Sequence, residues 1–338
     1  MTDLENINMY RMTDEHSADK MKFLITGASG FVGKTLTKHL LDGGHTVRGT
    51  LLPGESASNL TCGVASTVVG PLGQSTCWLH ALSDIDTVIH LAARVHVMDD
   101  QSTNPLLEYR RVNVEGIRRL AHDAVKAGVK RFIFVSSIKV NGEESDIPYH
   151  ADSLYNPQNP YAVSKMEAEQ NLRRIGDETG LEVVIVRPPL VYGPGVKANF
   201  LRMMQVVQQG LPLPLSSIHN RRSLIYVGNL ADALLTCATH SKATGKTFLV
   251  SDSEDVSTPE LVRRTAAAMG IPARLFPFPV SFMKVAGKLT GKSGAVHRLT
   301  GSLTVDSSKI RQELDWKPPF TMCEGLRATA EWFKENAR

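Results

Sequence analysis

A tyrosine and a lysine four positions apart are the side chains of this sequence best suited to chemistry. Tyr161 and Lys165 stand in the run Asn159-Pro160-Tyr161-Ala162-Val163-Ser164-Lys165. This spacing places both side chains on one face of a helix, and Pro160 suits the first turn of that helix. There the ammonium can hold the phenol partly ionised, and a phenol with a lowered pKa is a general acid and base. The pair predicts proton transfer at a sugar or alcohol oxygen.

A glycine-rich turn supplies a second candidate site. Gly27, Gly30 and Gly33 follow the pattern G-x-x-G-x-x-G between a predicted strand at 22–26 and a predicted helix at 31–41. Such a turn allows a tight bend, close approach of the backbone to a pyrophosphate, and close packing of helix on strand. Its place after the first strand predicts a dinucleotide-binding site.

The composition is that of a globular protein in a reducing compartment. The chain has 338 residues, 42% hydrophobic content and a net charge of +4, without a basic block that would indicate nucleic acid. No segment approaches the roughly 18 apolar residues of a membrane span. The four cysteines are scattered and predict buried thiols in the cytoplasm. Residues 1–20 lack the apolar core of a signal peptide, and we expect a disordered leader there.

Strands alternate with helices over the first half of the chain. After a second strand at 45–52, short apolar runs at 66–69, 87–92, 131–136 and 182–186 are separated by helical segments at 74–82, 105–127 and 160–179. This alternation predicts an α/β fold with a Rossmann-type, doubly wound parallel sheet over residues 21–188.

After Pro188-Pro189 the alternation ends. Helices expected near 200–209, 229–240, 259–269 and 322–336 are mixed with short strands and prolines. We therefore expect residues 189–338 to form a smaller α+β substrate lobe, with segments that return to the first domain. Residues 275–289 are unusually apolar, which indicates packing between the lobes, a substrate lid, or contact with a membrane surface or a lipid-linked sugar.

Several motifs in one order give the chain a family resemblance. They are the glycine turn, His90-Leu91-Ala92-Ala93, Asn113, Val135-Ser136-Ser137, the Tyr161 and Lys165 pair, Arg187 with Tyr192-Gly193-Pro194-Gly195, and Leu314-Asp315-Trp316-Lys317-Pro318. The chain resembles the extended short-chain dehydrogenase/reductase family in its nucleotide-sugar epimerase/dehydratase branch, from Lys22 to about Lys334.

The resemblance implies roles for the matching residues. Ser137 would hydrogen-bond the reacting sugar oxygen, Tyr161 would exchange the proton, and Lys165 would bind the nicotinamide ribose and lower the pKa of the phenol. Asn113 would support the local helix geometry. The implied cofactor site comprises Gly27, Ser29, Gly30, Phe31, Val32, Gly33, Leu91, Ala92 and Ala93, together with Tyr161 and Lys165. The implied substrate site comprises Ser137, Lys197, Asn199, Arg222 and Arg298, with Arg222 on the diphosphate. No metal site is expected.

Departures from the family pattern concern the cofactor and the reaction. Leu51 stands where an acidic residue usually holds the adenosine ribose of NAD, and Arg48 is the nearby arginine that could meet a 2′-phosphate. NAD or NADP is therefore expected, with NAD favoured. Ser137 is followed by Ile138-Lys139, whereas the sugar 4,6-dehydratases carry Asp-Glu there, so we do not expect dehydration.

The resemblance implies redox at C4 of a nucleotide-sugar substrate. We expect a UDP-sugar 4-epimerase that acts through a 4-keto intermediate on a UDP-hexose or UDP-N-acetylhexosamine for surface polysaccharide. An NAD(P)H-dependent 4-ketoreductase of a UDP-4-keto-6-deoxy-N-acetylhexosamine and a non-catalytic redox sensor are the alternatives. A homodimer is left open.

Overall fold

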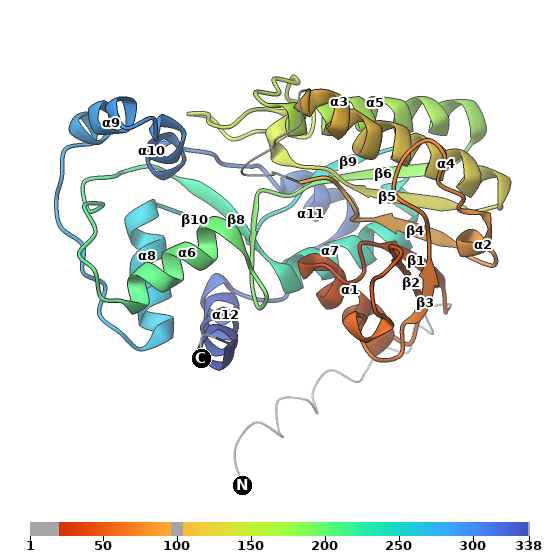
Figure 1. Cartoon of the computed structure of the whole chain (residues 1–338), viewed down its shortest axis with the longest axis horizontal. Coiled ribbons are helices and arrows are strands. Elements are labelled where there is room, and N and C mark those ends of the chain that lie inside the picture. The colour runs from red at the N-terminus through yellow and green to blue at the C-terminus, as the bar shows by residue number, and fades with distance from the viewer. Residues whose placement is uncertain (1–19, 96–103, 337–338) are drawn as a thin grey trace, which may run out of the picture.

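The computed structural model describes residues 20–95 and 104–336. The predicted leader lies outside this range except for Lys20, and so does His96, which carries no assigned role. Figure 1 shows a sheet with helices on both faces and, beside it, a smaller group of helices and strands formed by later parts of the chain.

A seven-stranded parallel sheet forms the centre of the larger part. Its order is β3-β2-β1-β4-β5-β6-β9. The strands are β1 (Lys22–Thr26), β2 (Thr46–Leu51), β3 (Ala65–Val68), β4 (Thr87–His90), β5 (Arg131–Val135), β6 (Glu182–Arg187) and β9 (Thr247–Leu249). This order and the parallel pairing confirm the predicted Rossmann-type fold.

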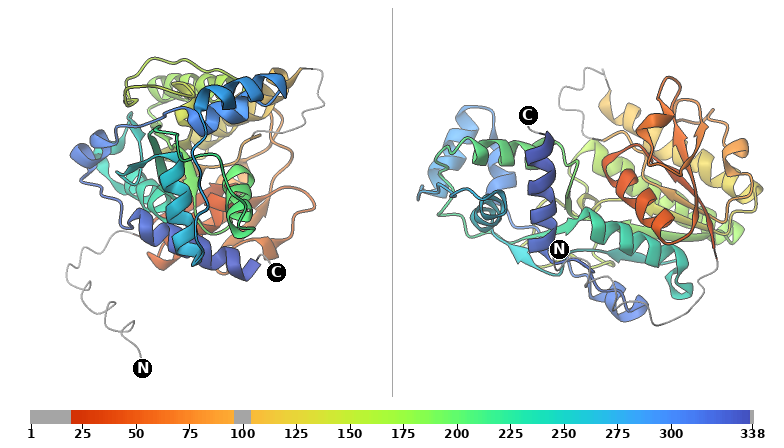
Figure 2. Two further views of the ribbon diagram at one scale, coloured as in Figure 1. Left: turned by 90° about the vertical axis from the view of Figure 1, so that its left-hand side faces the viewer. Right: turned by 90° about the horizontal axis from the view of Figure 1, so that it is seen from below.

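Helices cover both faces of this sheet, and the strands are therefore apolar on both sides. Phe23 and Ile25 of β1 point into one core and Leu24 into the other. The first core contains α1 (Phe31–Asp42), α7 (Val227–Thr239) and α11 (Ser308–Leu314). The second contains α2 (Leu79–Leu82), α4 (Gly116–Lys126) and α5 (Pro160–Thr179). Figure 2 shows these two layers from further directions.

Two expectations about helices were wrong. The helix predicted at 74–82 is only α2, because residues 70–78 form bends and turns. The helix predicted at 229–240 was assigned to the substrate lobe, but α7 packs on α1 and the sheet. Leu230 and Leu234 are fully buried in that core, so a pattern of apolar residues identified the helix without identifying its partner.

The smaller lobe has its own core around a three-stranded sheet. β7 (Leu190–Tyr192) pairs in parallel with β8 (Arg222–Tyr226), and β10 (Asp255–Val256) pairs with β8 in antiparallel fashion. Helices α6 (Ala198–Gln208), α8 (Thr258–Met269) and α12 (Met322–Asn336) pack around it. Helices α9 (Val280–Leu289) and α10 (Ser293–Thr300) form the outer end of this lobe (Figure 1).

The helical segment between β4 and β5 is interrupted once. It begins as α3 (Pro105–Arg110), passes through a π-helical turn at Arg111–Glu115 and continues as α4. A π-turn of this kind is frequent at functional sites.

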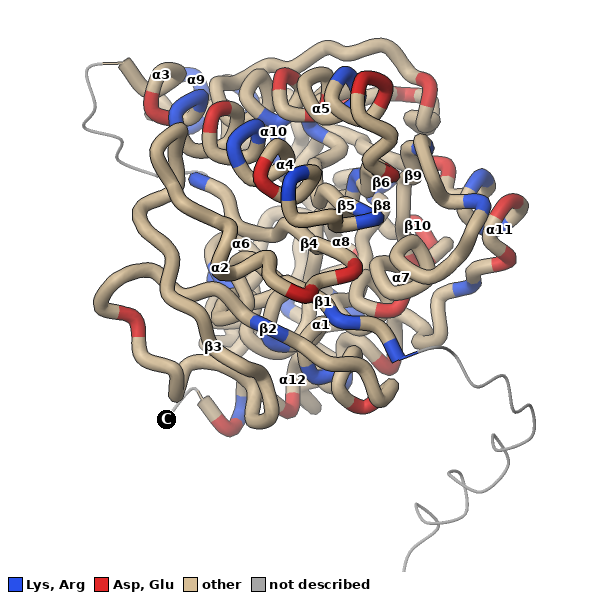
Figure 3. Tube along the Cα trace, turned by 90° about the vertical axis from the view of Figure 1, so that its right-hand side faces the viewer, with Lys and Arg blue, Asp and Glu red and all other residues tan. Residues whose placement is uncertain are grey.

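The surface carries charges of both signs, and the cysteines are mostly exposed. Lys, Arg, Asp and Glu are interspersed over the face drawn in Figure 3.

Cys62, Cys77 and Cys323 are exposed and only Cys237 is buried, so the prediction of buried thiols was wrong for three of the four. The exposed thiols lie in turns and on the outer face of α12. No helix within the described ranges is both long enough and apolar enough to cross a membrane.

Candidate active site

Helix α5 begins at the predicted proton-transfer pair. Asn159 caps the helix by accepting a hydrogen bond from the Ala162 backbone N–H at 2.9 Å, and Pro160 occupies the first helical position. Lys165 Nζ donates to the Val135 carbonyl at 2.9 Å and lies 6.0 Å from the centroid of the Tyr161 ring. The lysine therefore joins α5 to the carboxyl end of β5.

Ser137 completes a group of three side chains at this end of the sheet. It follows β5 and caps a short 3-10 helix by accepting from the Lys139 backbone N–H at 3.3 Å. Its hydroxyl lies close enough to the Tyr161 phenol to lower the pKa of that group. The structure thus brings Ser137, Tyr161 and Lys165 together, although the serine lies 24 positions before the tyrosine.

Burial controls the protonation of this group. Burial raises the pKa of Tyr161 to about 12, against the lowering effect of the Ser137 hydrogen bond. Burial likewise lowers the pKa of Lys165 to about 7, against the raising effect of Glu169. The sequence predicted a lowered pKa for the phenol. In the protein without cofactor the pKa of Tyr161 is raised instead, because desolvation of the phenolate outweighs its stabilisation. The phenol is protonated at neutral pH.

Asn113 ties the π-helical turn to this site. Its Nδ2 donates to the Arg94 carbonyl and to Ser164 Oγ, both at 3.0 Å, and its Oδ1 accepts from the Arg94 N–H at 2.8 Å. Ser164 in turn donates to the Tyr161 carbonyl at 2.8 Å. Asn113 therefore connects the segment after β4 with the first turn of α5, which holds the tyrosine.

The glycine turn forms a backbone cradle that fits a dinucleotide. Gly27 has a φ of +70°, and a Cβ there would lie 3.0 Å from the Ala92 nitrogen. A Cβ at Gly33 would lie only 2.2 Å from the Gly27 carbonyl oxygen. Gly30 precedes α1 without a side-chain cap, so backbone N–H groups are presented at the start of a twelve-residue helix. This is the arrangement that binds a pyrophosphate.

The end of β4 is linked to this cradle through buried side chains. His90 Nδ1 and Thr26 Oγ1 are 2.8 Å apart, and Thr26 Oγ1 accepts from the Ala92 N–H at 3.2 Å. Burial lowers the pKa of His90 to about 3, so the ring is neutral. The segment Leu91, Ala92 and Ala93 is held against the glycine turn by these contacts.

The other predicted cofactor residues surround the cradle. Ser29 and Val32 are half-buried next to Gly30. Phe31 packs against the core of the smaller lobe, and a Cβ at Gly195 would lie 3.5 Å from its ring. Phe31 therefore links the cradle to the second lobe.

The end of β2 differs from the expectation drawn from the sequence. Leu51 is only 2% exposed, so it is buried at the end of β2. Arg48 was expected near a 2′-phosphate, but its Nη1 donates to the carbonyls of Ala81 and Ser83 at 2.9 and 2.8 Å. These bonds direct the guanidinium toward α2.

Two of the predicted substrate residues lie together beside a cavity. Arg222 Nη1 donates to the carbonyls of Arg298 and Gly301 at 3.2 and 2.9 Å, at the end of α10. Arg298 lines a cavity of about 460 Å³ between α10 and the segment that follows β5; its other lining residues are Gly142, Glu143, Glu144, Asn156, Gln158, Gly294 and His297. Lys197 and Asn199 are exposed at the start of α6 and are not among the residues that line this cavity.

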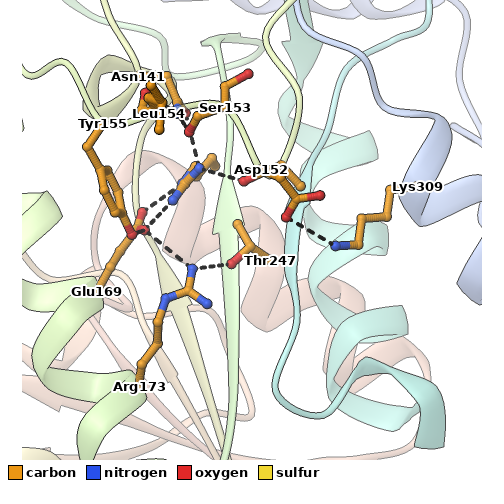
Figure 4. Close-up of polar contacts among 11 residues, drawn as sticks. Asn141, Asp152, Ser153, Leu154, Tyr155, Glu169, Arg173, Thr247 and Lys309 are labelled. Atoms are coloured by element: carbon orange, nitrogen blue, oxygen red, sulfur yellow. Dashed lines mark hydrogen bonds and ion pairs between the residues drawn. The ribbon is translucent and has the colours of Figure 1, made fainter.

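Sequence reasoning missed a buried ion pair behind Ser137, Tyr161 and Lys165. Glu169 lies one helical turn after Lys165 and is paired with Arg187 of β6 at 2.6 Å. Figure 4 shows the Glu169 carboxylate with Tyr155 and Arg173 close to it. The spacing of four between Lys165 and Glu169 was the available signal, because it predicts that both lie on the same face of α5.

Known proteins resemble this chain over nearly its whole length. The family model described as NAD dependent epimerase/dehydratase family matches residues 23–251. A UDP-glucose 4-epimerase of Vibrio cholerae is 46% identical, with 92% of this chain and 94% of that protein covered. An N-acetyl-alpha-D-glucosaminyl-diphospho-ditrans,octacis-undecaprenol 4-epimerase of Escherichia coli O157:H7 is 26% identical, with coverage of 91% and 94%.

A solved structure extends this likeness to the cofactor. MoeE5 in complex with UDP-glucose and NAD has a TM-score of 0.74 and 25% identity, and the match covers 94% of this chain and 100% of that chain. The family description and this complex confirm the resemblance found in the sequence, and they confirm NAD, the cofactor that the sequence favoured.

Proposed function

The chain belongs to the NAD dependent epimerase/dehydratase family and is an NAD-dependent enzyme, and we propose that it is a 4-epimerase of a UDP-hexose or UDP-N-acetylhexosamine. The observation that carries this proposal is the meeting of Ser137, Tyr161 and Lys165 at the end of β5, next to the glycine cradle. A hydroxyl and a phenol can there share one substrate oxygen, which is what reversible oxidation of a sugar alcohol requires.

The residues of the chain would move the proton of that oxygen. Ser137 would orient the 4-hydroxyl group, and Tyr161 would take its proton as the C4 hydrogen leaves as hydride. When bound, NAD supplies the hydride acceptor, and its oxidised ring carries a positive charge. Positive charge beside the phenol favours the phenolate, as does an ammonium on Lys165, and both oppose the effect of burial. After the 4-keto sugar has turned its other face, Tyr161 would return the proton.

The substrate end of the proposal rests on the second lobe. Arg298 lines the cavity at α10 and Arg222 donates to the Arg298 carbonyl, and guanidinium groups suit a diphosphate. The 46% identical relative is a UDP-glucose 4-epimerase, which supports a UDP-hexose. The name of the Escherichia coli relative contains an N-acetylhexosamine, which supports that class as well. We place the product among the precursors of surface polysaccharide.

A 4-ketoreductase is the second candidate function. The end of β2 favours it, because residues 48–54 contain no carboxylate that could hold the cofactor tightly through many turnovers. A redox sensor without turnover would not require Ser137, Tyr161 and Lys165 to lie close together. It is therefore the weakest of the three alternatives.

Product analysis with soluble substrates distinguishes these functions. The protein is incubated with UDP-glucose, and separately with UDP-N-acetylglucosamine, with catalytic NAD. A third incubation contains a UDP-4-keto-6-deoxy-N-acetylhexosamine with NADH, and the sugars are identified by proton NMR. An epimerase gives the C4 epimer without net formation of NADH. A ketoreductase converts only a 4-keto sugar and consumes one NADH per product, which would replace our proposal. If neither reaction occurs, both enzymatic assignments are refuted. Sedimentation of the same sample decides between a monomer and a homodimer.

A further inference from the structure

We propose that helix α9 docks on the surface of an anionic lipid bilayer. The outward side chains of this helix are apolar and exposed: Phe282 is 64%, Val285 56% and Leu289 82% exposed. They follow each other at intervals of three and four residues and therefore form one stripe along the helix. This stripe, defined as Phe282, Val285 and Leu289, is the contact surface of the proposal.

The opposite side of α9 is anchored to the lobe. Met283 is buried in the core of the smaller lobe, and a Cβ on the buried Gly287 would lie 2.7 Å from a methyl group of Val296 on α10. The helix is therefore held by one side in a fixed orientation, which presents the stripe outward. Figure 1 shows α9 and α10 together at the end of the molecule farthest from β3.

A second aromatic side chain extends the stripe at the start of the helix. Phe278 is exposed and its ring centroid lies 6.4 Å from that of Phe282. Phe276 is also exposed, two positions earlier. Large apolar groups gathered in this way on one exposed helix and its entry segment indicate a surface that binds something.

The charge of the segment identifies an anionic partner. Between residues 274 and 298 the sequence has no Asp or Glu and five basic residues: Arg274, Lys284, Lys288, Lys292 and Arg298. Lys284 and Lys288 are exposed on one flank of the stripe, and Lys292 follows it. The nearest acid with a contact to α10 is Glu144, whose carboxylate lies 3.4 Å from His297.

This combination fits a bilayer surface. A helix that places Phe and Leu on one face and Lys beside them lies in the interface, with its apolar groups among the acyl chains and its ammonium groups at anionic headgroups. The long Lys stems allow their charged ends to reach the headgroups while the helix is partly immersed. An apolar groove on a protein partner would bind the stripe but would not require Lys284, Lys288 and Lys292 beside it.

The docking would place the candidate substrate cavity close to the lipid surface. Only residues 290–292 separate α9 from α10, and His297 and Arg298 of α10 line that cavity. The proposal rests on exposure and charge at α9 and does not depend on the reaction assigned above.

Vesicle sedimentation tests the proposal with the full chain. Binding is measured on vesicles of phosphatidylcholine alone and of phosphatidylcholine with phosphatidylglycerol, at low and high salt. We expect the protein to bind the anionic vesicles and to be released by salt, and the double variant Phe282→Asp/Leu289→Asp to bind at least about tenfold more weakly. The pair Lys284→Glu/Lys288→Glu should lose the preference for anionic vesicles.

Leu79→Asp is the matched control, because Leu79 is 48% exposed on α2 and lies on the other lobe. It should bind vesicles like the unchanged protein, and circular dichroism should show that all variants are folded. Turnover of a water-soluble substrate should be unchanged in the α9 variants. Failure of the unchanged protein to bind anionic vesicles, or equal binding by the double variant, overturns the proposal. Loss of self-association in the double variant without any vesicle binding would instead identify an interface between two copies.

Discussion

Arg187 and Glu169 form a buried ion pair that connects β6 to α5 behind the proton-transfer group. Arg187 Nη2 lies 2.6 Å from Glu169 Oε2, and the side chains are 2% and 0% exposed. Tyr155 donates its hydroxyl hydrogen to the same carboxylate at 2.8 Å, and Arg187 also donates to Asn141 Oδ1 at 3.2 Å. The pair fixes α5 one turn beyond Lys165, so its integrity is required for the position of the lysine.

Removal of the arginine should destabilise the protein strongly. Arg187→Met leaves the Glu169 carboxylate buried without its main partner, and we expect a loss of about 3–5 kcal/mol in the free energy of unfolding. Arg173→Met is the control, because Arg173 is 39% exposed and lies 3.8 Å from the same carboxylate. Its loss should be within about 1 kcal/mol. Urea unfolding measures both, and equal losses would show that the buried pair has no special role.

The titration of Lys165 should be visible near neutral pH. With lysine labelled at 13Cε, NMR of the cofactor-free protein should show one residue with a pKa of about 7, because burial lowers the pKa. Glu169 raises this pKa, so Glu169→Gln should move it further down. Between about pH 7 and the ordinary lysine value, the unfolded chain binds more protons, so the contribution of Lys165 to stability increases with pH. A lysine signal that titrates only above pH 10 in both proteins would contradict this.

Loss of the phenol should abolish turnover while the fold is kept. Tyr161→Phe removes the proton donor and acceptor but retains the packed ring, so we expect a decrease in kcat of about 10³-fold with unchanged NAD binding. Tyr109→Phe is the control, since its ring lies 6.2 Å from that of Tyr161 and its hydroxyl donates to the Val95 carbonyl. Near-normal rates for Tyr161→Phe would remove this residue from the mechanism.

Arg222 should contribute to binding of the substrate diphosphate. Arg222→Ala removes a charge-assisted contact, and we expect weaker binding of UDP by about 1.5–3 kcal/mol without a change in NAD affinity. The neighbouring Arg221 is 73% exposed and pairs with Asp255, so Arg221→Ala should have little effect. Calorimetry with UDP and with NAD measures both variants. An equal loss for the cofactor, or unchanged UDP binding, would place Arg222 outside the substrate site.

A carboxylate at Leu51 should destabilise the fold and leave the cofactor preference unchanged. Leu51→Asp buries a charge in the core, and we expect a loss of roughly 3 kcal/mol or more in the free energy of unfolding. Leu52, which is 40% exposed, tolerates the same change within about 1 kcal/mol. Thermal unfolding, together with NAD and NADP titration of both variants, tests this. A stable Leu51→Asp protein with stronger NAD binding would show that position 51 faces the ribose after all.

The local elements of the site could be predicted from the sequence because each depends on neighbours in the chain. A proline after a capping Asn159 begins α5, and a spacing of four then places Tyr161 and Lys165 on one face. The turn requires glycine at positions 27 and 33, because a Cβ at either position would lie too close to neighbouring backbone atoms. Strand and helix alternation likewise predicted the parallel sheet.

Tertiary structure decided the features that depend on distant partners and on burial. Packing of neighbouring segments buries Leu51, and hydrogen bonds to the carbonyls of Ala81 and Ser83 hold the Arg48 guanidinium beside α2. Likewise, α7 covers the sheet because its apolar face fits α1, which its own sequence does not specify.

The protonation of Tyr161 and Lys165 is the clearest example. The sequence determined that a phenol and an ammonium are neighbours, and from their charges alone the pKa of Tyr161 was expected to fall. The fold encloses both groups, and the cost of removing a charge from water exceeds their mutual stabilisation. The pKa of Tyr161 is therefore raised to about 12 and that of Lys165 is lowered to about 7. Spacing along a helix is a local property, whereas desolvation depends on every segment that packs around the site.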